Sequence, residues 1–231
     1  ALKISMDSVF IWSYFMTNDM NKDFARSLEL RGVIPVLMVF MAKSGYHVLD
    51  VKKVTINKNG KIVSSLPGRK DTDNPWDTYI SGVRIKYVEN RSYKIRELYY
   101  FSHDVSDKNL EKTPEFITFI ESQPVDGAFF KAASYLCWYF TKIRNAVLAK
   151  ADVILQTDSG IPLRYLNNSN WDLTFYGKYT RPIGVFRWTM QPELKKIYKT
   201  NKDIKPLKFG IGYGIRYKES NLMVAKRKNS D

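Results

Sequence analysis

Residues that build disulfide frameworks and metal centres are scarce in this sequence. Its 231 residues include one cysteine and two histidines, His47 and His103. A single cysteine excludes a disulfide framework and a cysteine metal site, and two histidines argue against a histidine-rich zinc centre. We therefore expect no metal. The lone cysteine is compatible with both the cytosol and the periplasm, so it does not decide the compartment.

Long apolar stretches and nucleotide-binding signatures are also missing. The longest apolar run, residues 33–42, contains Pro35 and reaches about half the length of a membrane-spanning helix. It predicts a buried helix and no transmembrane span. The glycines at Gly210, Gly212 and Gly214 lack the spacing of the dinucleotide-binding fingerprint, and no helix is predicted after them. We therefore expect no cofactor.

A strong positive charge marks a composition that is otherwise ordinary for a globular protein. The chain is 44% hydrophobic and 26% charged, and its formal net charge is +14. Residues 181–231 hold thirteen Lys or Arg against four acids, which gives +9 of that total. Such a region attracts nucleic acid, an anionic polymer or lipid, or an acidic protein.

The order of helix and strand patterns predicts an α+β fold. Apolar residues at 83, 85 and 87 alternate with Arg84 and Lys86, so we expect a hairpin with one core face and one basic face. The strongest helical pattern covers residues 127–150. Its apolar positions are Phe129, Ala133, Leu136, Phe140, Ile143 and Val147. We predict a mixed or largely antiparallel sheet packed on this long central helix.

The chain is predicted to form a single domain over residues 1–231. Its N-terminal part, residues 1–66, is expected to be looser, and residues 79–231 form the core part. Residues 66–78 are polar and rich in turn-forming residues, which predicts a surface loop.

A polar site is expected at the turn formed by residues 157–160. Asp158, Ser159 and Arg164 are predicted to converge there with Trp171 and Tyr176. An arginine fork beside aromatic rings suits a carboxylate, phosphate or sugar ligand. The more economical interpretation is structural: Asp158 accepts backbone hydrogen bonds of its own turn, and a glycine follows with positive φ. A strand is expected on each side of this turn, over residues 153–156 and 161–166.

Catalysis at this turn would need a base. A nucleophilic Ser159 requires a neighbouring proton acceptor, and His103 with Asp104 beside it is the candidate. Neighbouring residues of a strand point to opposite faces, so Asp104 could orient His103 only where the strand is broken. We therefore keep His103 and Asp104 as candidates of the same site.

The motifs from residue 100 onward resemble a family of uncharacterised bacterial proteins, many of them exported. They share the pattern Gln156-x-Asp158-Ser159-Gly160-Ile161-Pro162-x-Arg164-Tyr165, followed by Trp171, Tyr176-Gly177, Tyr179, Pro182-Ile183, Gln191-Pro192 and Phe209–Tyr213. The chain departs from the family at Thr157, where an acid is usual, and at Cys137-Trp138, where Met-His is expected. The family's further N-terminal Ser-Gly-Pro-Asp motif is missing, so we expect this chain to be part of a longer product or a split version.

Three functions follow from these observations. The resemblance implies a location in the cell envelope, periplasmic or extracellular, while a cytoplasmic location stays an alternative. It implies no enzymatic activity. The first hypothesis is a non-enzymatic envelope protein that binds an acidic partner protein or an anionic cell-surface polymer through its basic C-terminal half. The second is a hydrolase or transferase centred on residues 157–165. The third is a nucleic-acid-binding protein, which needs the basic side chains of residues 178–228 to form one stripe.

Overall fold

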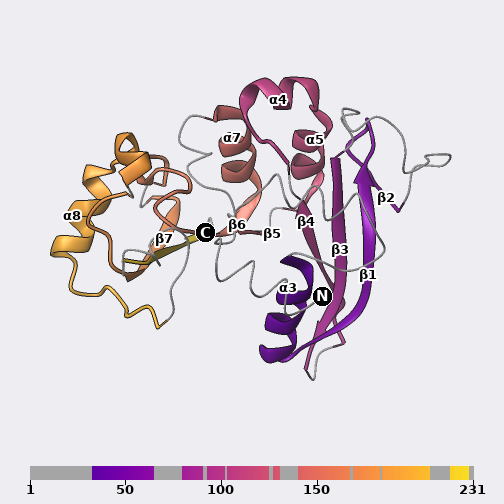
Figure 1. Cartoon of the computed structure of the whole chain (residues 1–231), viewed down its shortest axis with the longest axis horizontal. Coiled ribbons are helices and arrows are strands. Elements are labelled where there is room, and N and C mark those ends of the chain that lie inside the picture. Colours follow the sequence, from indigo (N-terminus) through magenta and orange to yellow (C-terminus); the bar gives the residue numbers. More distant parts are fainter. Residues whose placement is uncertain are drawn as a thin grey trace. The chain divides into compact units, whose positions relative to one another are not determined.

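Figure 1 shows the computed structural model of the chain, which describes residues 33–64, 80–90, 93–101, 103–124, 127–130, 140–166, 169–182, 184–208 and 219–228. Contacts within the chain divide it into unit 1 (residues 1–104 and 109–119) and unit 2 (residues 105–108 and 120–231). Each unit holds one four-stranded sheet together with helices. The predicted α+β class is therefore confirmed, and each unit is described by itself.

Unit 1 contains an antiparallel sheet in the strand order β2-β1-β3-β4 (Figure 1). Its strands are β1 (Tyr46–Ile56), β2 (Ile62–Val63), β3 (Ile80–Glu89) and β4 (Arg96–Phe101). The pairing of β3 with β4 confirms the predicted hairpin. Val83 and Ile85 of β3 are buried against Ile34 and Met41 of the helix α3 (Val33–Lys43), so the apolar run forms a core helix as expected.

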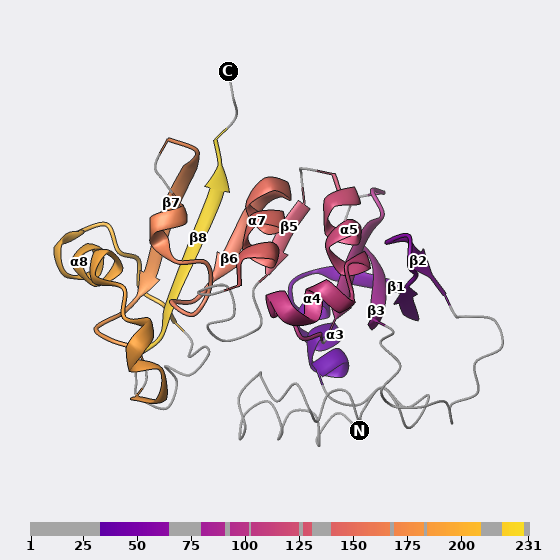
Figure 2. The same ribbon diagram turned by 90° about the horizontal axis from the view of Figure 1, so that it is seen from above.

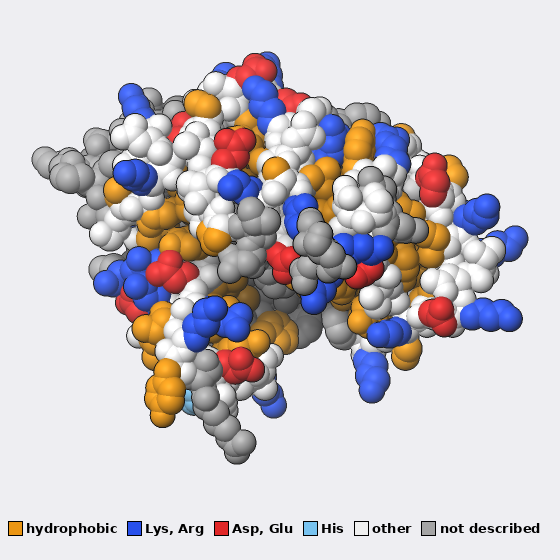
Figure 3. Space-filling view, turned by 180° about the vertical axis from the view of Figure 1, so that it is seen from behind, with side chains coloured by type: hydrophobic (Ala, Val, Ile, Leu, Met, Phe, Trp, Pro, Cys, Tyr) orange, Lys and Arg blue, Asp and Glu red, His pale blue; other side chains and the backbone are white. Residues whose placement is uncertain are grey.

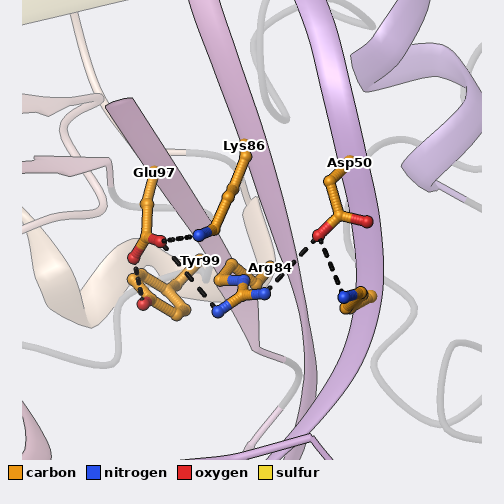
Figure 4. Close-up of polar contacts among 6 residues, drawn as sticks. Asp50, Arg84, Lys86, Glu97 and Tyr99 are labelled. Atoms are coloured by element: carbon orange, nitrogen blue, oxygen red, sulfur yellow. Dashed lines mark hydrogen bonds and ion pairs between the residues drawn. The ribbon is translucent and has the colours of Figure 1, made fainter. Parts of the chain in front are cut away.

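The opposite face of this sheet carries a cross-strand network of charges (Figure 4). Arg84 Nη2 lies 3.5 Å from an oxygen of Asp50, and Lys86 Nζ lies 3.3 Å from an oxygen of Glu97. The Tyr99 hydroxyl donates a hydrogen bond to the other oxygen of Glu97. Carboxylates from the two neighbouring strands therefore pair with Arg84 and Lys86 on the face that the sequence pattern predicts to be basic.

This network predicts an acid-sensitive contribution to the stability of unit 1. The Tyr99 hydrogen bond, followed by the bond and charge of Lys86, lowers the pKa of Glu97 below its ordinary value of 4.5, and partial burial opposes this effect. A lowered folded pKa stabilises the protein above the unfolded pKa, and the stabilisation is lost as the pH falls through the folded pKa. We expect Glu97→Gln to flatten the decline of the unfolding free energy between about pH 6 and pH 3.

Urea unfolding followed across this pH range checks the Glu97 prediction. Glu89→Gln, at the exposed end of β3, removes the same charge and is the matched control. Equal flattening in both variants would mean that the general loss of a negative charge, and not the contact with Tyr99 and Lys86, causes the effect.

Unit 2 contains a mixed sheet in the strand order β5-β6-β8-β7 (Figure 2). Its strands are β5 (Gly127–Phe130), β6 (Ala151–Gln156), β7 (Trp171–Gly177) and β8 (Asn221–Arg227). β5 runs parallel to β6, and the other neighbours are antiparallel. Unit 2 also holds the helices α7 (Thr141–Lys150) and α8 (Pro192–Thr200) and the 3-10 helices η1 (Leu163–Tyr165) and η2 (Gly184–Thr189). The helices α4 (Asp107–Lys112) and α5 (Glu115–Ser122) have most of their residues in unit 1 and the rest in unit 2.

The predicted helix over residues 127–150 is wrong in its first part. Gly127–Phe130 forms the strand β5, and the helix in this region is α7, which begins at Thr141. The Asp107 carboxylate marks that beginning, because it accepts hydrogen bonds from the backbone N–H groups of Thr141 (3.0 Å) and Lys142 (2.9 Å) and so caps the helix. Residues 131–139, which supplied part of the periodic pattern, lie outside the described residues.

Within the residues that the structure describes, no helix is both long and apolar enough to cross a bilayer. The longest apolar run of the sequence, residues 33–42, lies within the eleven-residue helix α3, which is shorter than the roughly 20 residues that a span needs.

Candidate functional site

The Asp158 turn, residues 157–160, follows β6 directly. The Gly160 N–H donates to the Thr157 carbonyl (3.0 Å), and the Thr157 and Ser159 hydroxyls are hydrogen-bonded to each other (2.8 Å). The expected positive φ of Gly160 is wrong, since the described glycines with positive φ are Gly45, Gly60 and Gly177. Glycine is needed at this position for another reason: a Cβ on Gly160 would lie 2.2 Å from the Gln156 side-chain oxygen.

Three buried amide side chains, which we call the amide clamp, hold the turn in place. They are Gln156, Gln191 and Asn221, exposed by 2%, 3% and 8%. Gln156 makes two hydrogen bonds to the backbone of Ile161, accepting from its N–H (2.8 Å) and donating to its carbonyl (2.7 Å). This pairing resembles one rung of a β-ladder, made by a side chain instead of a second strand.

The other two amides connect the turn with distant segments of unit 2. Gln191, just before α8, donates to the Asp158 carbonyl (2.8 Å) and accepts from the Leu163 N–H (2.9 Å). Asn221, the first residue of β8, accepts from the Asp158 N–H (2.6 Å) and donates to an Asp158 carboxylate oxygen (3.0 Å). The clamp therefore satisfies the polar groups of the turn, which would otherwise be costly to bury.

The clamp also replaces the strand that we expected over residues 161–166. The chain there turns through Pro162 into η1, and the Leu163 N–H bonds to Gln191 instead of to a neighbouring strand. Ile161 and Leu166 are buried on either side of this 3-10 turn. The prediction of a strand is wrong because the backbone groups of Ile161 and Leu163 bond to amide side chains, and the N–H groups of Tyr165 and Leu166 bond to carbonyls within the 3-10 turn.

A small cavity lies beside the turn, lined among others by Asp158, Gln191, Tyr198 and Asn221. Its volume is about 10 Å³, which is about the room that one water molecule needs. A sugar ring or a peptide does not fit into such a space. Burial raises the pKa of Tyr179 to about 12 and also raises the pKa of Tyr198, so both phenols keep their protons at neutral pH.

Ser159, Arg164 and Trp171 each contact different residues. Ser159 is 6% exposed and bonds to Thr157. Arg164 is exposed on η1 and donates to the hydroxyl of Tyr165, its neighbour in sequence (3.4 Å). Trp171 is 4% exposed, and the Arg227 guanidinium lies 4.7 Å from its ring centre while it donates to the carbonyls of Leu148 and Ala151 at the end of α7.

Tyr176 and the two residues of unit 1 complete the set of predicted site residues. The Tyr176 ring lies 5.7 Å from Lys205 Nζ, and its carbonyl accepts the Tyr198 hydroxyl. His103 is hydrogen-bonded to Thr113 Oγ1 (3.0 Å), and its pKa is lowered by burial. Asp104 is exposed, and its carbonyl accepts a hydrogen bond from Asn109 (2.7 Å). His103 and Asp104 belong to unit 1, whereas the other five predicted residues belong to unit 2.

A basic segment follows Gln191 of the clamp in sequence. We call residues 192–208 the lysine segment; they comprise α8 and the chain after it. It carries six lysines, Lys195, Lys196, Lys199, Lys202, Lys205 and Lys208, against the two acids Glu193 and Asp203. All six lysines are exposed, and within the described residues none of them takes part in an ion pair.

The lysine segment is fixed to unit 2 at both ends. Leu194 is 3% exposed, and Tyr198 donates its hydroxyl to the carbonyls of Tyr176 and Leu222. Beyond α8, the Lys205 N–H donates to Phe175, and its carbonyl accepts from Gly177, so the chain pairs with the edge of β7. The lysines therefore project from a held backbone and not from a loose loop.

Sequence reasoning missed the amide clamp and its geometry. Gln156, Asp158 and Gln191 belong to the motifs quoted for the family resemblance. Those motifs were the sequence signal that could have pointed to the clamp. Within the described part of the chain, no group of three or more His, Cys, Asp or Glu side chains could hold a metal ion. Comparisons of the chain with protein-family models, with curated proteins and with solved structures gave no match.

Proposed function

We propose that this protein is a non-enzymatic envelope protein that binds an acidic partner protein or an anionic cell-surface polymer through the lysine segment. The observation that carries this proposal is the set of six exposed lysines outside every described ion pair. Clustered positive charge attracts a polyanion and raises its association rate. The envelope location rests on the resemblance of the sequence motifs.

The arrangement of α8 favours a binding surface. Leu194 and Tyr198 face the interior of unit 2, whereas Lys195, Lys196 and Lys199 are exposed. In Figure 3, lysine and arginine side chains project from the right-hand edge, where α8 lies in this view. Because the backbone is held by Tyr198 and by pairing with β7, less conformational entropy is lost when a partner binds.

The contacts of the Asp158 turn support a binding role over a hydrolytic one. The side chains that would act in a hydrolase, Asp158 and Ser159, bond to Asn221 and Thr157. The cavity beside them has room for about one water molecule. A general base must come within hydrogen-bond reach of a substrate proton, and the space at this turn gives a substrate little access.

A panel of polyanions tests the proposal and its nucleic-acid alternative. The probes are polyglutamate, single-stranded DNA and vesicles of anionic phospholipid, each titrated at several salt concentrations. We expect polyglutamate to bind at low salt and to bind more weakly as salt screens the lysines. Absence of polyglutamate binding at low salt, or binding that does not respond to salt, would contradict the proposal. Tighter binding of DNA with a steep salt dependence would favour the nucleic-acid alternative instead.

A further inference from the structure

Two arginines meet at one tyrosine ring on the surface of unit 2, outside the lysine segment. The Arg144 guanidinium carbon, on α7, lies 4.1 Å from the centre of the Tyr165 ring. The guanidinium carbon of Arg164, on η1, lies 5.0 Å from the same ring centre. One aromatic ring therefore holds two positive charges close together, which makes the surface around it favourable for an anion.

The side chain of Arg144 has unused hydrogen-bonding capacity. Its Nε is buried and has no hydrogen-bond partner in the described part of the chain. Within the described residues, the Arg144 guanidinium takes part in no hydrogen bond or ion pair, and it stacks on the Tyr165 ring. An arginine carries five N–H donors in a planar fork, so the stacked position of Arg144 leaves donors for a ligand.

The third group at this place is the Tyr165 hydroxyl. It accepts a hydrogen bond from Arg164 Nη2 (3.4 Å). That bond, with the charges of Arg144 and Arg164, lowers the pKa of Tyr165. The lowered pKa indicates a positive electrostatic potential at the hydroxyl. Such a potential favours a negatively charged group at this place on the surface.

We propose that Arg144, Arg164 and Tyr165 form a binding site for a phosphate group, either free phosphate or a phosphomonoester on a larger molecule. Two guanidinium groups balance the two charges of a phosphate dianion, whereas a carboxylate balances one of them. The forks of both arginines match phosphate oxygens in geometry, and the Tyr165 hydroxyl adds a third donor. This site shares no residue with the lysine segment, so it goes beyond the proposed function and can fail independently of it.

Titration with inorganic phosphate, followed by NMR, tests this site. The Nε–H signal of Arg144 is a suitable probe, because its buried position slows exchange with water. At constant ionic strength, we expect saturable shifts of this signal and of the amides of residues 163–166. Glycerol 3-phosphate, used as a second probe, distinguishes a phosphomonoester from free phosphate as the preferred ligand, and saturable binding of either supports the site.

Variants connect the shifts to the proposed residues. Arg164→Gln, at an exposed position, is expected to weaken phosphate binding at least about tenfold, since a hydrogen bond to a charged group contributes about that factor. Arg144→Gln should do the same, and the unfolding midpoint of each variant is measured to confirm folding. Arg187→Gln, which removes an exposed arginine from η2, is the matched control and should bind phosphate as the unaltered protein does.

Two outcomes would overturn the proposal. Equal, non-saturating shifts with phosphate, sulfate and chloride would mean that the region responds only to diffuse ionic strength. Acetate binding as tightly as phosphate would assign the site to a single carboxylate and would reject the match to a dianion. A failure of polyglutamate binding would leave this result unchanged, because the lysine segment is not involved.

Discussion

Replacing Gly160 with alanine is expected to lower the free energy of unfolding of unit 2 by about 3 kcal/mol. The added Cβ would lie 2.2 Å from Gln156 Oε1, 2.4 Å from its Cδ and 2.8 Å from its Cβ. Gln156 is 2% exposed, so it has little space to move away. Its displacement would break both hydrogen bonds to Ile161 and leave buried polar groups without partners.

A double-mutant cycle makes the Gly160 prediction specific to the clamp. In a Gln156→Ala background the obstructing side chain is gone, so Gly160→Ala should cost less than about 1 kcal/mol. Gln156→Ala is itself destabilising, because the N–H and carbonyl of Ile161 lose their partner. Chemical denaturation of the four proteins gives the coupling energy. Equal costs of Gly160→Ala in both backgrounds would contradict the close packing of Gln156 on Gly160.

Neutralising the lysine segment is expected to produce the largest change in binding. Changing Lys195, Lys196, Lys199 and Lys202 to glutamine removes four charges and preserves helix propensity at the three positions within α8. If each lysine contributes about 0.5 kcal/mol, within the range for exposed ion pairs, the variant should bind polyglutamate about thirtyfold more weakly at low salt. Its affinity should also depend less on salt, since fewer charges remain to be screened.

A control variant with the same net charge separates local from general electrostatics. It carries glutamine at four exposed lysines of unit 1, Lys43, Lys58, Lys61 and Lys112. Isothermal titration at two salt concentrations compares both variants with the unaltered protein. An equal loss of affinity in the control variant would show that the total charge of +14, and not the lysine segment, attracts the polyanion.

Sequence patterns correctly predicted those elements whose buried face is determined by the segment's own residues. The alternation of apolar residues with Arg84 and Lys86 predicted a hairpin, and β3 and β4 form it. The apolar run of residues 33–42 predicted a buried helix, and α3 forms it. In both cases the pattern of one segment determines which of its faces is buried.

The long helix was predicted wrongly because periodicity does not separate a buried strand from a buried helix. Residues 127–130 pair in parallel with β6, a contact made with a segment more than twenty residues later. The start of α7 depends on Asp107, which is 34 residues before Thr141. Neither the parallel pairing nor this distant cap leaves a signal within residues 127–150.

The candidate site was predicted in part. The turn at Asp158 and the scarcity of bases were visible in the sequence, but the amide clamp was not. Asn221 is 63 residues from Asp158 and Gln191 is 33 residues from it, so their contacts depend on how β8 and α8 fold onto β6. The charge of residues 181–231 was likewise visible, whereas the exposure of each lysine in the lysine segment required the structure.

Lysine footprinting tests the central claim most directly. The acetylation rate of each lysine is measured by mass spectrometry, with and without polyglutamate. We predict that bound polyglutamate slows acetylation of Lys195, Lys196, Lys199 and Lys202 while Lys58 and Lys61 of unit 1 react at unchanged rates. Equal protection of all lysines, or protection confined to unit 1, would contradict the assignment of binding to the lysine segment.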